Sequence, residues 1–241
     1  MQRYFGRIFK NMIVLDEDDK YHLLKVMRAR KGEQIEVVAD EKVYLSEIVS
    51  AKPLEIIAKK TLKDNSELPN YIILLAALLK GDKMDFVLQK ATELGVSEVV
   101  LLTTDRTIVK IKDHQNDLKL GRYQKILKEA AQQSKRNRIP YIKNIISFDR
   151  IDEIDADLKF IAYEENKGDV SAFNKKLKNV KPGKKIAIII GPEGGFTEGE
   201  VIYAKHHGFS PVGLGNRILR AETASIYALS VIANHLEDKN A

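Results

Sequence analysis

The chain has 241 residues, of which 44% are hydrophobic and 31% charged, and 40 Lys and Arg against 34 Asp and Glu give a formal net charge of +6. This composition is that of a globular protein of one or two domains, and it excludes a disordered, collagen-like or coiled-coil chain. The absence of cysteine excludes disulfides, thiolate metal sites and cysteine nucleophiles. No apolar run reaches the ~18 residues of a membrane span, and the first residues lack a signal peptide's apolar stretch, so we expect a cytoplasmic protein.

The first 69 residues predict a small barrel around one helix. Asp16, with Asp19 three residues later, resembles a helix start, and this helix is expected to run to Arg30. The expected strands are residues 3–9, 34–38, 43–49 and 54–61. Short strands rich in β-branched residues and joined by brief turns are typical of a barrel. The polar, proline-terminated stretch 63–69 predicts a linker, so a domain boundary is expected between residues 69 and 70.

From residue 70 onward, the pattern changes to alternating buried strands and amphipathic helices. The run 71–79 is almost continuously apolar, as in a strand that is covered on both faces. Further strands are expected at residues 98–103, 159–163, 185–190 and 211–214. Helices are expected at residues 83–94, 117–135, 171–179, 198–206 and 221–236. This alternation predicts an α/β domain with a mostly parallel sheet over residues 70–241.

Positive charge is concentrated in residues 119–143, where eight basic residues and a single acidic one, Glu129, give a net charge of +7. A solvated helix face is the common explanation for such a run. The alternative is a surface that binds nucleic-acid phosphates.

Two turns after predicted strands carry residues suited to a ligand. The strand ending at Ile190 leads into Gly-Pro-Glu-Gly-Gly-Phe-Thr at 191–197, and glycines let backbone amides approach a bound molecule. Thr197 and Glu200 match a capping box for the helix that follows. The sequence is neither a dinucleotide fingerprint nor a P-loop, and a plain strand-to-helix turn explains this segment alone equally well.

The second turn, residues 214–224, leads from a strand into the last helix. Its apolar residues Ile218 and Leu219 could cover a flat aromatic ligand such as adenine. Arg220 and Glu222 place a cation and an anion at the start of the helix, where Glu222 also suits the helix dipole and could simply pair with Arg220. Two such turns in neighbouring segments favour a shared pocket.

These motifs together resemble the SPOUT methyltransferases and, more narrowly, the ribosomal RNA small subunit methyltransferase E family, which methylates N3 of a uridine in 16S ribosomal RNA. The matching segments are Arg-Tyr-Phe at 3–5, His-x-x-x-Val-x-Arg at 22–28, Lys-Met-Asp at 83–85, Gln-Lys-Ala-Thr-Glu-Leu-Gly at 89–95, Arg106, Gln-Gln-Ser-x-Arg at 132–136, Gly-Pro-Glu-Gly-Gly at 191–195 and Leu-Gly-x-Arg-Ile-Leu-Arg-x-Glu-Thr-Ala at 214–224. They follow one another in order over nearly the whole chain.

The resemblance implies a PUA-like RNA-binding barrel over residues 1–69 and a SPOUT domain with a trefoil knot over residues 70–241. It also implies a homodimer, S-adenosylmethionine as cofactor, no metal, and 16S ribosomal RNA within the small subunit as substrate. The residues expected to bind the cofactor are Glu164, Ile190, Gly191, Pro192, Gly195, Leu214, Gly215, Ile218, Leu219 and Thr223.

Methylation of N3 requires removal of its proton, so a carboxylate base and a cation near the flanking carbonyl oxygens are expected. Glu222 and Arg220 are the candidates for these two roles, because they lie between the cofactor turn and the last helix. The expected RNA contacts are Arg3, Arg7, Arg28, Arg30, Arg136 and Arg138. With this resemblance, a phosphate-binding surface becomes the preferred interpretation of residues 119–143.

Two alternatives remain. One is another SPOUT enzyme, such as a transfer-RNA ribose methyltransferase, against which the Arg-Tyr-Phe start and the predicted barrel argue. The other is an RNA-binding or assembly factor that has lost turnover, against which the intact turns at 191–195 and 220–223 argue.

Overall fold

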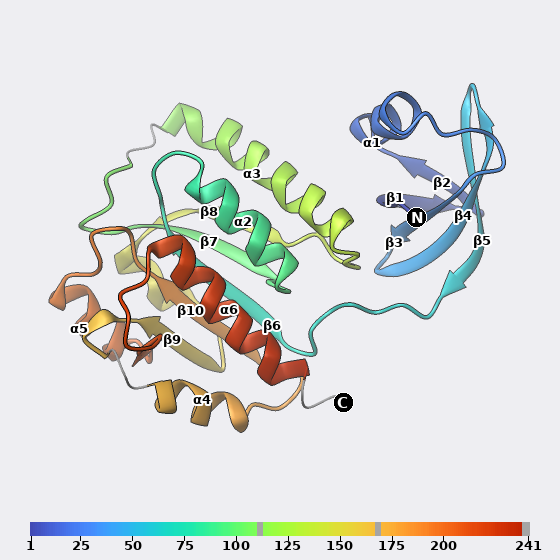
Figure 1. Ribbon diagram of the computed structural model, residues 1–241. Helices are drawn as coiled ribbons and strands as arrows, with labels where there is room; N and C mark the ends of the chain where they lie inside the picture. Colours follow the sequence, from blue (N-terminus) through green and yellow to red (C-terminus); the bar gives the residue numbers. More distant parts are fainter. Residues whose placement is uncertain (110–112, 167–169, 238–241) are drawn as a thin grey trace. The chain divides into compact units, whose positions relative to one another are not determined.

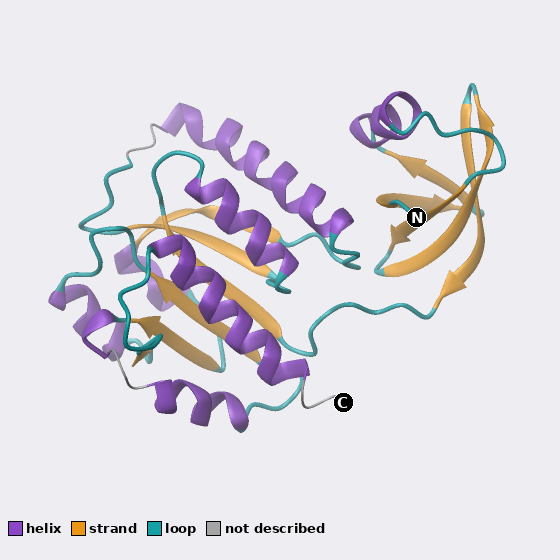
Figure 2. Ribbon diagram, in the orientation of Figure 1, coloured by secondary structure: helices purple, strands orange, loops and turns teal. Residues whose placement is uncertain are grey.

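The computed structural model describes residues 1–109, 113–166 and 170–237, which form two compact units (Figures 1 and 2). The first unit comprises Met1–Glu67 and Ala131–Ile139, and the second comprises Leu68–Ala130 and Pro140–Ala241. The boundary in the linker lies two residues before the predicted position. Residues 131–139, which sequence analysis placed in the second domain, belong to the first unit instead.

The first unit is a closed barrel with the strand order β1-β2-β5-β4-β3. Its strands are β1 (Arg3–Phe9), β2 (Met12–Leu15), β3 (Gln34–Ala39), β4 (Lys42–Ala51) and β5 (Leu54–Leu62). β1 pairs in parallel with β3, and the other neighbours are antiparallel. Alternate side chains, among them Tyr4, Val37 and Ile48, fill the interior. β2 was not predicted, because it has four residues and only Ile13 and Leu15 of them are buried.

The helix of the barrel unit begins where it was predicted and ends earlier. The carboxylate of Asp16 accepts a hydrogen bond from the Asp19 backbone N–H at 2.9 Å and caps α1 (Glu17–Tyr21). The chain continues as the π-helix η1 (His22–Val26). Arg28 has a φ of +54°, which no right-handed helix accommodates, so the helix cannot extend to Arg30.

A buried arginine ties the linker and residues 131–139 to the barrel. The Arg3 guanidinium pairs with Glu36, its Nε lying 2.9 Å from Oε2, and with Asp64 in the linker. It also donates to the side chain of Asn137 at 2.9 Å and to the backbone carbonyl of Lys135. Because these partners lie 33 to 134 residues away in the chain, local sequence patterns could not place residues 131–139 in this unit.

Replacing Arg3 by Met is expected to lower the free energy of unfolding by about 3 kcal/mol, the low end for breaking a buried ion pair, because Glu36 keeps Lys135 as a partner while Asp64 loses its cation. Urea denaturation of the full chain measures this loss. Arg7→Met removes an exposed arginine of the same strand and should change stability by less than about 0.5 kcal/mol. An equally small effect of Arg3→Met would show that the buried pairs do not stabilise the barrel.

The second unit is built on a six-stranded sheet with the order β11-β9-β10-β6-β7-β8, in which all neighbours are parallel. Its strands are β6 (Tyr71–Ala77), β7 (Glu98–Thr103), β8 (Tyr141–Ser147), β9 (Leu158–Ala162), β10 (Lys185–Ile190) and β11 (Ser210–Val212). The predicted α/β class is therefore confirmed, whereas the knot remains a prediction. β8 was not predicted, because it is an edge strand in which only Ile142 and Ile146 are buried.

Helices cover both faces of this sheet. They are α2 (Lys83–Glu93), α3 (Asp113–Gln133), α4 (Val170–Lys178), α5 (Glu198–His206) and α6 (Ala221–Glu237), with the 3-10 helices η2 (Phe148–Glu153) and η3 (Glu164–Asn166). α2, α6 and α4 lie on one face (Figure 1). On the other face, α5 and η2 pack on alternate strand residues such as Leu75 and Ile189. In the part of the chain that the structure describes, none of the helices combines the length and the apolar character needed to cross a membrane.

Candidate active site

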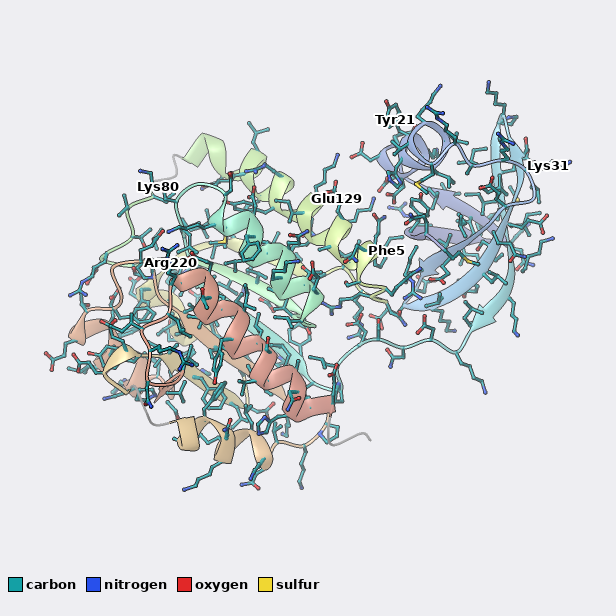
Figure 3. All side chains as sticks on the ribbon, viewed as in Figure 1. Phe5, Tyr21, Lys31, Lys80, Glu129 and Arg220 are labelled. Carbon is teal, nitrogen blue, oxygen red and sulfur yellow. The ribbon has the colours of Figure 1, made fainter. Side chains whose placement is uncertain are left out.

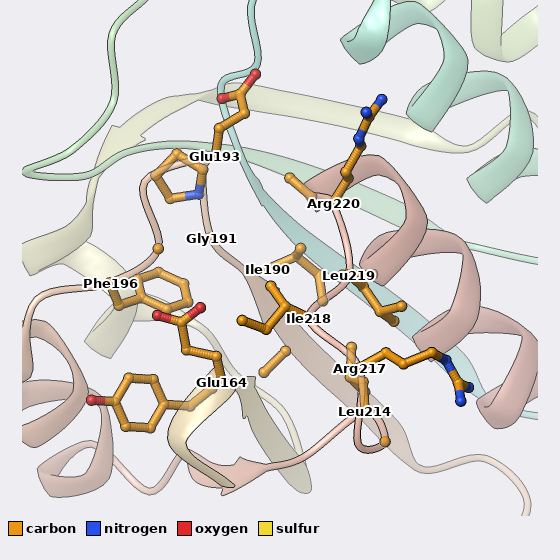
Figure 4. A pocket seen from close by; sticks show the side chains of 17 residues that line it. Glu164, Ile190, Gly191, Glu193, Phe196, Leu214, Arg217, Ile218, Leu219 and Arg220 are labelled. Atoms are coloured by element: carbon orange, nitrogen blue, oxygen red, sulfur yellow. The ribbon is translucent and has the colours of Figure 1, made fainter. Parts of the chain in front are cut away.

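A pocket of about 280 Å³ lies where β9, β10 and β11 end (Figure 4). The carboxyl ends of parallel strands meet at one edge of a sheet, so the segments after these strands converge there. Nine of the ten residues predicted to bind the cofactor line the pocket, and so does Arg220. Thr223 does not line it and is exposed in the first turn of α6. The other lining residues are Ala162, Tyr163, Glu193, Phe196, Arg217, Ala221 and Ala224.

The turn after β10 is shaped by an aromatic ring that sequence analysis did not select. A Cβ on Gly191 would lie 2.9 Å from Cε2 of Phe196, so only glycine fits beneath this ring. Phe196 is buried and packs on Phe148 of η2, with the ring centroids 5.6 Å apart. Gly195 has a φ of +69°, a conformation that favours glycine. The two glycines therefore serve different needs, one for space and one for backbone conformation.

Two neighbouring segments hold this turn in place. The predicted capping box is present, since Thr197 caps α5 and Glu200 accepts from the Thr197 backbone N–H at 2.8 Å. Glu200 also accepts from the Asp105 backbone N–H at 2.9 Å, although it is buried. Arg106 donates from Nη1 to the Gly194 carbonyl oxygen at 2.8 Å. The loop after β7 thus fixes the position of the glycine turn.

The turn after β11 supplies an apolar cover. Gly215 has a φ of +113°, and a Cβ there would meet nothing within 4 Å. The backbone conformation, rather than a lack of space, therefore favours glycine at this position. Ile218 lines the pocket with 74% of its surface exposed, and Figure 4 shows it among the lining side chains beside Leu219. An apolar side chain left this exposed at a pocket is suited to lie against a flat ligand.

Charged side chains gather at the rim of the pocket. Lys83, the first residue of α2, donates from Nζ to Glu193 Oε1 at 2.8 Å. This hydrogen bond raises the pKa of Lys83. Burial is the largest single influence on the pKa of Glu193 and would raise it, but the hydrogen bond and charge of Lys83 together with backbone hydrogen bonds outweigh burial, and the pKa is lowered. Within the described residues, Arg220 and Glu222 form no ion pair with each other, and the buried Oε2 of Glu222 has no hydrogen-bond partner.

The predicted RNA contacts fall into two groups. Arg7, Arg28 and Arg30 are exposed on the barrel unit, and Arg138 is about half exposed beside Glu41. Arg3 and Arg136 were also predicted to contact RNA, but the structure places them in the interior. Both guanidinium groups are buried within the first unit and pair with carboxylates, that of Arg136 with Glu67.

Acidic residues elsewhere in the chain neutralise much of the basic segment 119–143. At least four of its eight cations have carboxylate partners, namely Arg122 with Asp85, Lys135 with Glu36, Arg136 with Glu67, and Arg138 with Glu41. Each partner lies at least 37 residues away along the chain. The net charge of this segment therefore overstates the charge that it offers to a ligand.

The barrel, the parallel sheet and the pocket at its edge are those of an RNA methyltransferase: residues 66–233 match the RNA methyltransferase domain family, and residues 15–61 match the RNA methyltransferase PUA domain family. The chain is 36% identical to ribosomal RNA small subunit methyltransferase E of Bacillus subtilis over 98% of each chain. It is 34% identical to methyltransferase E 2 of Borreliella burgdorferi over 95% of this chain and 93% of that one. The chain belongs to the ribosomal RNA small subunit methyltransferase E family, as its motifs predicted.

Two solved structures with bound cofactor are similar over nearly the whole chain. A putative methyltransferase of Legionella pneumophila in complex with S-adenosylmethionine is 32% identical, with a TM-score of 0.88 over 97% of each chain. Ribosomal RNA small subunit methyltransferase E of Neisseria gonorrhoeae, bound to S-adenosyl methionine, is 28% identical, with a TM-score of 0.85 over 97% of each chain.

Proposed function

We propose that the protein transfers a methyl group from S-adenosylmethionine to N3 of a uridine in the decoding region of 16S ribosomal RNA. The observation that carries the proposal is the convergence of the turns after β10 and β11 on one pocket. Family membership and the cofactor in two solved relatives support it. The proposed partners are the small ribosomal subunit and a second copy of this chain.

The lining of the pocket offers groups suited to the proposed cofactor. Gly191 lines the pocket at the end of β10, and Ile218 and Leu219 offer apolar cover for an adenine ring. Glu164 and Glu193, the two lining carboxylates, suit a ligand that carries a positive sulfonium. When bound, S-adenosylmethionine supplies an electrophilic methyl group.

The residues at the rim suit the removal of a proton from N3. Glu222 accepts this proton, and Arg220 stabilises the negative charge that develops on the uracil carbonyl oxygens. The bond between N3 and the methyl carbon forms as the methyl–sulfur bond breaks, and the electron pair of that bond remains on sulfur. The proposed products are therefore 3-methyluridine, S-adenosylhomocysteine and one proton.

Incubation of small subunits, and separately of free 16S RNA, with isotopically labelled cofactor tests the proposal. Nucleoside mass spectrometry of the digested RNA should find the label in 3-methyluridine. A product methylated on ribose or on C5 of the base would contradict the assignment to N3. Absence of labelled RNA from both substrates would favour an RNA-binding factor without turnover.

The exposed face of the barrel suits contact with RNA. Tyr21 has 64% of its surface exposed, and Figure 3 shows its side chain and that of Lys31 projecting from this unit. Arg28 and Arg30 are exposed in the same segment, and neither has an ion-pair partner within the described residues. Cations interleaved with an aromatic ring can bind phosphates and stack on bases.

Reversing both charges, in Arg28→Glu/Arg30→Glu, is expected to weaken RNA binding roughly tenfold or more and to reduce its salt dependence, because phosphate contacts release counterions. Filter binding over a series of salt concentrations measures both quantities. Lys175→Glu/Lys178→Glu on the exposed side of α4 makes the same change in net charge away from the barrel. Equal losses in the two double variants would show that only net charge matters.

A further inference from the structure

Lys83 reaches the rim of the pocket from α2, a helix that carries none of the predicted site residues. Its ammonium binds Glu193 at 2.8 Å, and Glu193 itself lines the pocket. The charges of Glu222 and Arg220 also act on Lys83, the first raising its pKa and the second lowering it. α2 packs against α6, which begins at Ala221 between these two residues.

The rim therefore collects two cations and two carboxylates from three separate segments of the second unit. Figure 4 shows the side chains of Glu193 and Arg220 extending to the same side of the pocket. One carboxylate, Glu193, is engaged by Lys83. The other, Glu222, keeps a buried oxygen without a hydrogen-bond partner among the described residues.

This combination of groups is complementary to one edge of uracil. That edge presents an acceptor, a donor and an acceptor, which are O2, N3–H and O4. Lysine and arginine donate without accepting, and an ionised carboxylate accepts without donating. Two cations and a carboxylate thus match the groups of this uracil edge, whereas the corresponding edge of cytosine has an unprotonated N3 and an amino group in place of O4.

We propose that Lys83 is a third catalytic residue, which donates to one uracil carbonyl oxygen while Arg220 donates to the other and Glu222 takes the N3 proton. This inference rests on the proposed function. Glu193 holds the ammonium of Lys83 at the rim until the base enters. Loss of the N3 proton spreads negative charge over O2 and O4, so a cation at each oxygen stabilises the anion that attacks the methyl group.

The competing explanation is that Lys83 only holds the glycine turn through Glu193. The two explanations differ in what happens when Glu193 is replaced. If Lys83 acts on the uracil, Glu193→Gln leaves its ammonium available, and Lys83→Met is the more damaging change. If Lys83 acts only through Glu193, the two single variants and the double variant are equally impaired.

The test compares the wild-type protein with Lys83→Met, Lys83→Arg, Glu193→Gln and Lys83→Met/Glu193→Gln. The measurements are S-adenosylmethionine affinity by calorimetry and single-turnover formation of 3-methyluridine on saturating small subunits at several pH values. Lys83→Met should be about 100-fold slower, the cost of removing one donor to a developing anion, with cofactor affinity within about twofold. Its rate should also need a higher pH to reach the plateau, because the bound N3–H is less acidic without this cation.

Lys83→Arg keeps a donor and should recover part of the rate, and Glu193→Gln should lose less rate without a shift of the pH profile. Lys205→Met, which removes an exposed charge on α5, should retain the wild-type rate. Undiminished turnover by Lys83→Met, or equal losses in Lys83→Met, Glu193→Gln and the double variant, would overturn the inference while the proposed function stands. If wild-type protein forms no 3-methyluridine, the proposed function fails and this inference fails with it.

Discussion

Replacing Glu222 by Gln is expected to slow methyl transfer by about 100- to 10,000-fold, the range for removal of a general base. The amide keeps the size of the side chain and can still accept a hydrogen bond, but it cannot take up the N3 proton. The acceptor that would take it is the buried oxygen of Glu222 at the start of α6, which has no hydrogen-bond partner among the described residues. Because Glu222 does not line the pocket, cofactor affinity should stay within about twofold of that of the wild-type protein.

Single-turnover rates on saturating small subunits isolate this effect from RNA binding, and calorimetry with S-adenosylmethionine confirms that the pocket is intact. Glu237→Gln, at the exposed end of the same helix, provides a control with the same chemical change. A Glu222→Gln variant that methylates at the wild-type rate would remove Glu222 from the mechanism. Water or another group would then have to accept the proton.

Much of the pocket could be predicted from the sequence, because its determinants are local. Residues 191–195 and 214–219 each follow a buried strand, and the parallel order of the sheet places both turns at one edge. The capping box of Thr197 and Glu200 needs only four consecutive residues. Phe196 could not be selected in this way, since its role depends on a close approach to Gly191 that exists only in the folded turn.

The roles of the charged residues could not be predicted in the same way. Arg3 and Arg136 look like surface cations in a basic sequence, but their carboxylate partners come from distant segments of the chain. Burial of such groups is tolerated only when they are paired, and pairing depends on the tertiary structure. Lys83 illustrates the opposite case. In the sequence it is one lysine at the start of a helix, and only its contact with Glu193 in the folded protein places it at the pocket.

In the proposed function, cofactor binding and proton removal take place in different parts of the site. Glycine turns and apolar side chains form the interior of the pocket, whereas Lys83, Arg220 and Glu222 lie at the rim or just beyond it. Substitutions in the interior should therefore change cofactor affinity, and substitutions at the rim should change the rate. The Glu222 variant tests the expectation that substitutions at the rim change the rate.

Gly191→Ala tests the expectation that substitutions in the interior of the pocket change cofactor affinity. A Cβ at this position would lie 2.9 Å from the Phe196 ring, which packs on Phe148 and has little room to move. Overpacking of this kind costs about 1–3 kcal/mol, so S-adenosylmethionine should bind roughly 10- to 100-fold more weakly as the turn shifts. At saturating cofactor, the single-turnover rate should fall by less than about tenfold, because the proton acceptor and the cations remain.

Gly199→Ala is the matched control, because a Cβ on this glycine of α5 would meet nothing within 4 Å. Alanine also favours a helix over glycine by about 0.5–1 kcal/mol, so this variant should bind the cofactor normally and be no less stable than the wild-type protein. If Gly191→Ala binds S-adenosylmethionine as tightly as Gly199→Ala does, then the contact between Gly191 and Phe196 does not shape the cofactor site. Cofactor binding would then tolerate a shift of the turn after β10, and the close contact with Phe196 would not explain why residue 191 is a glycine.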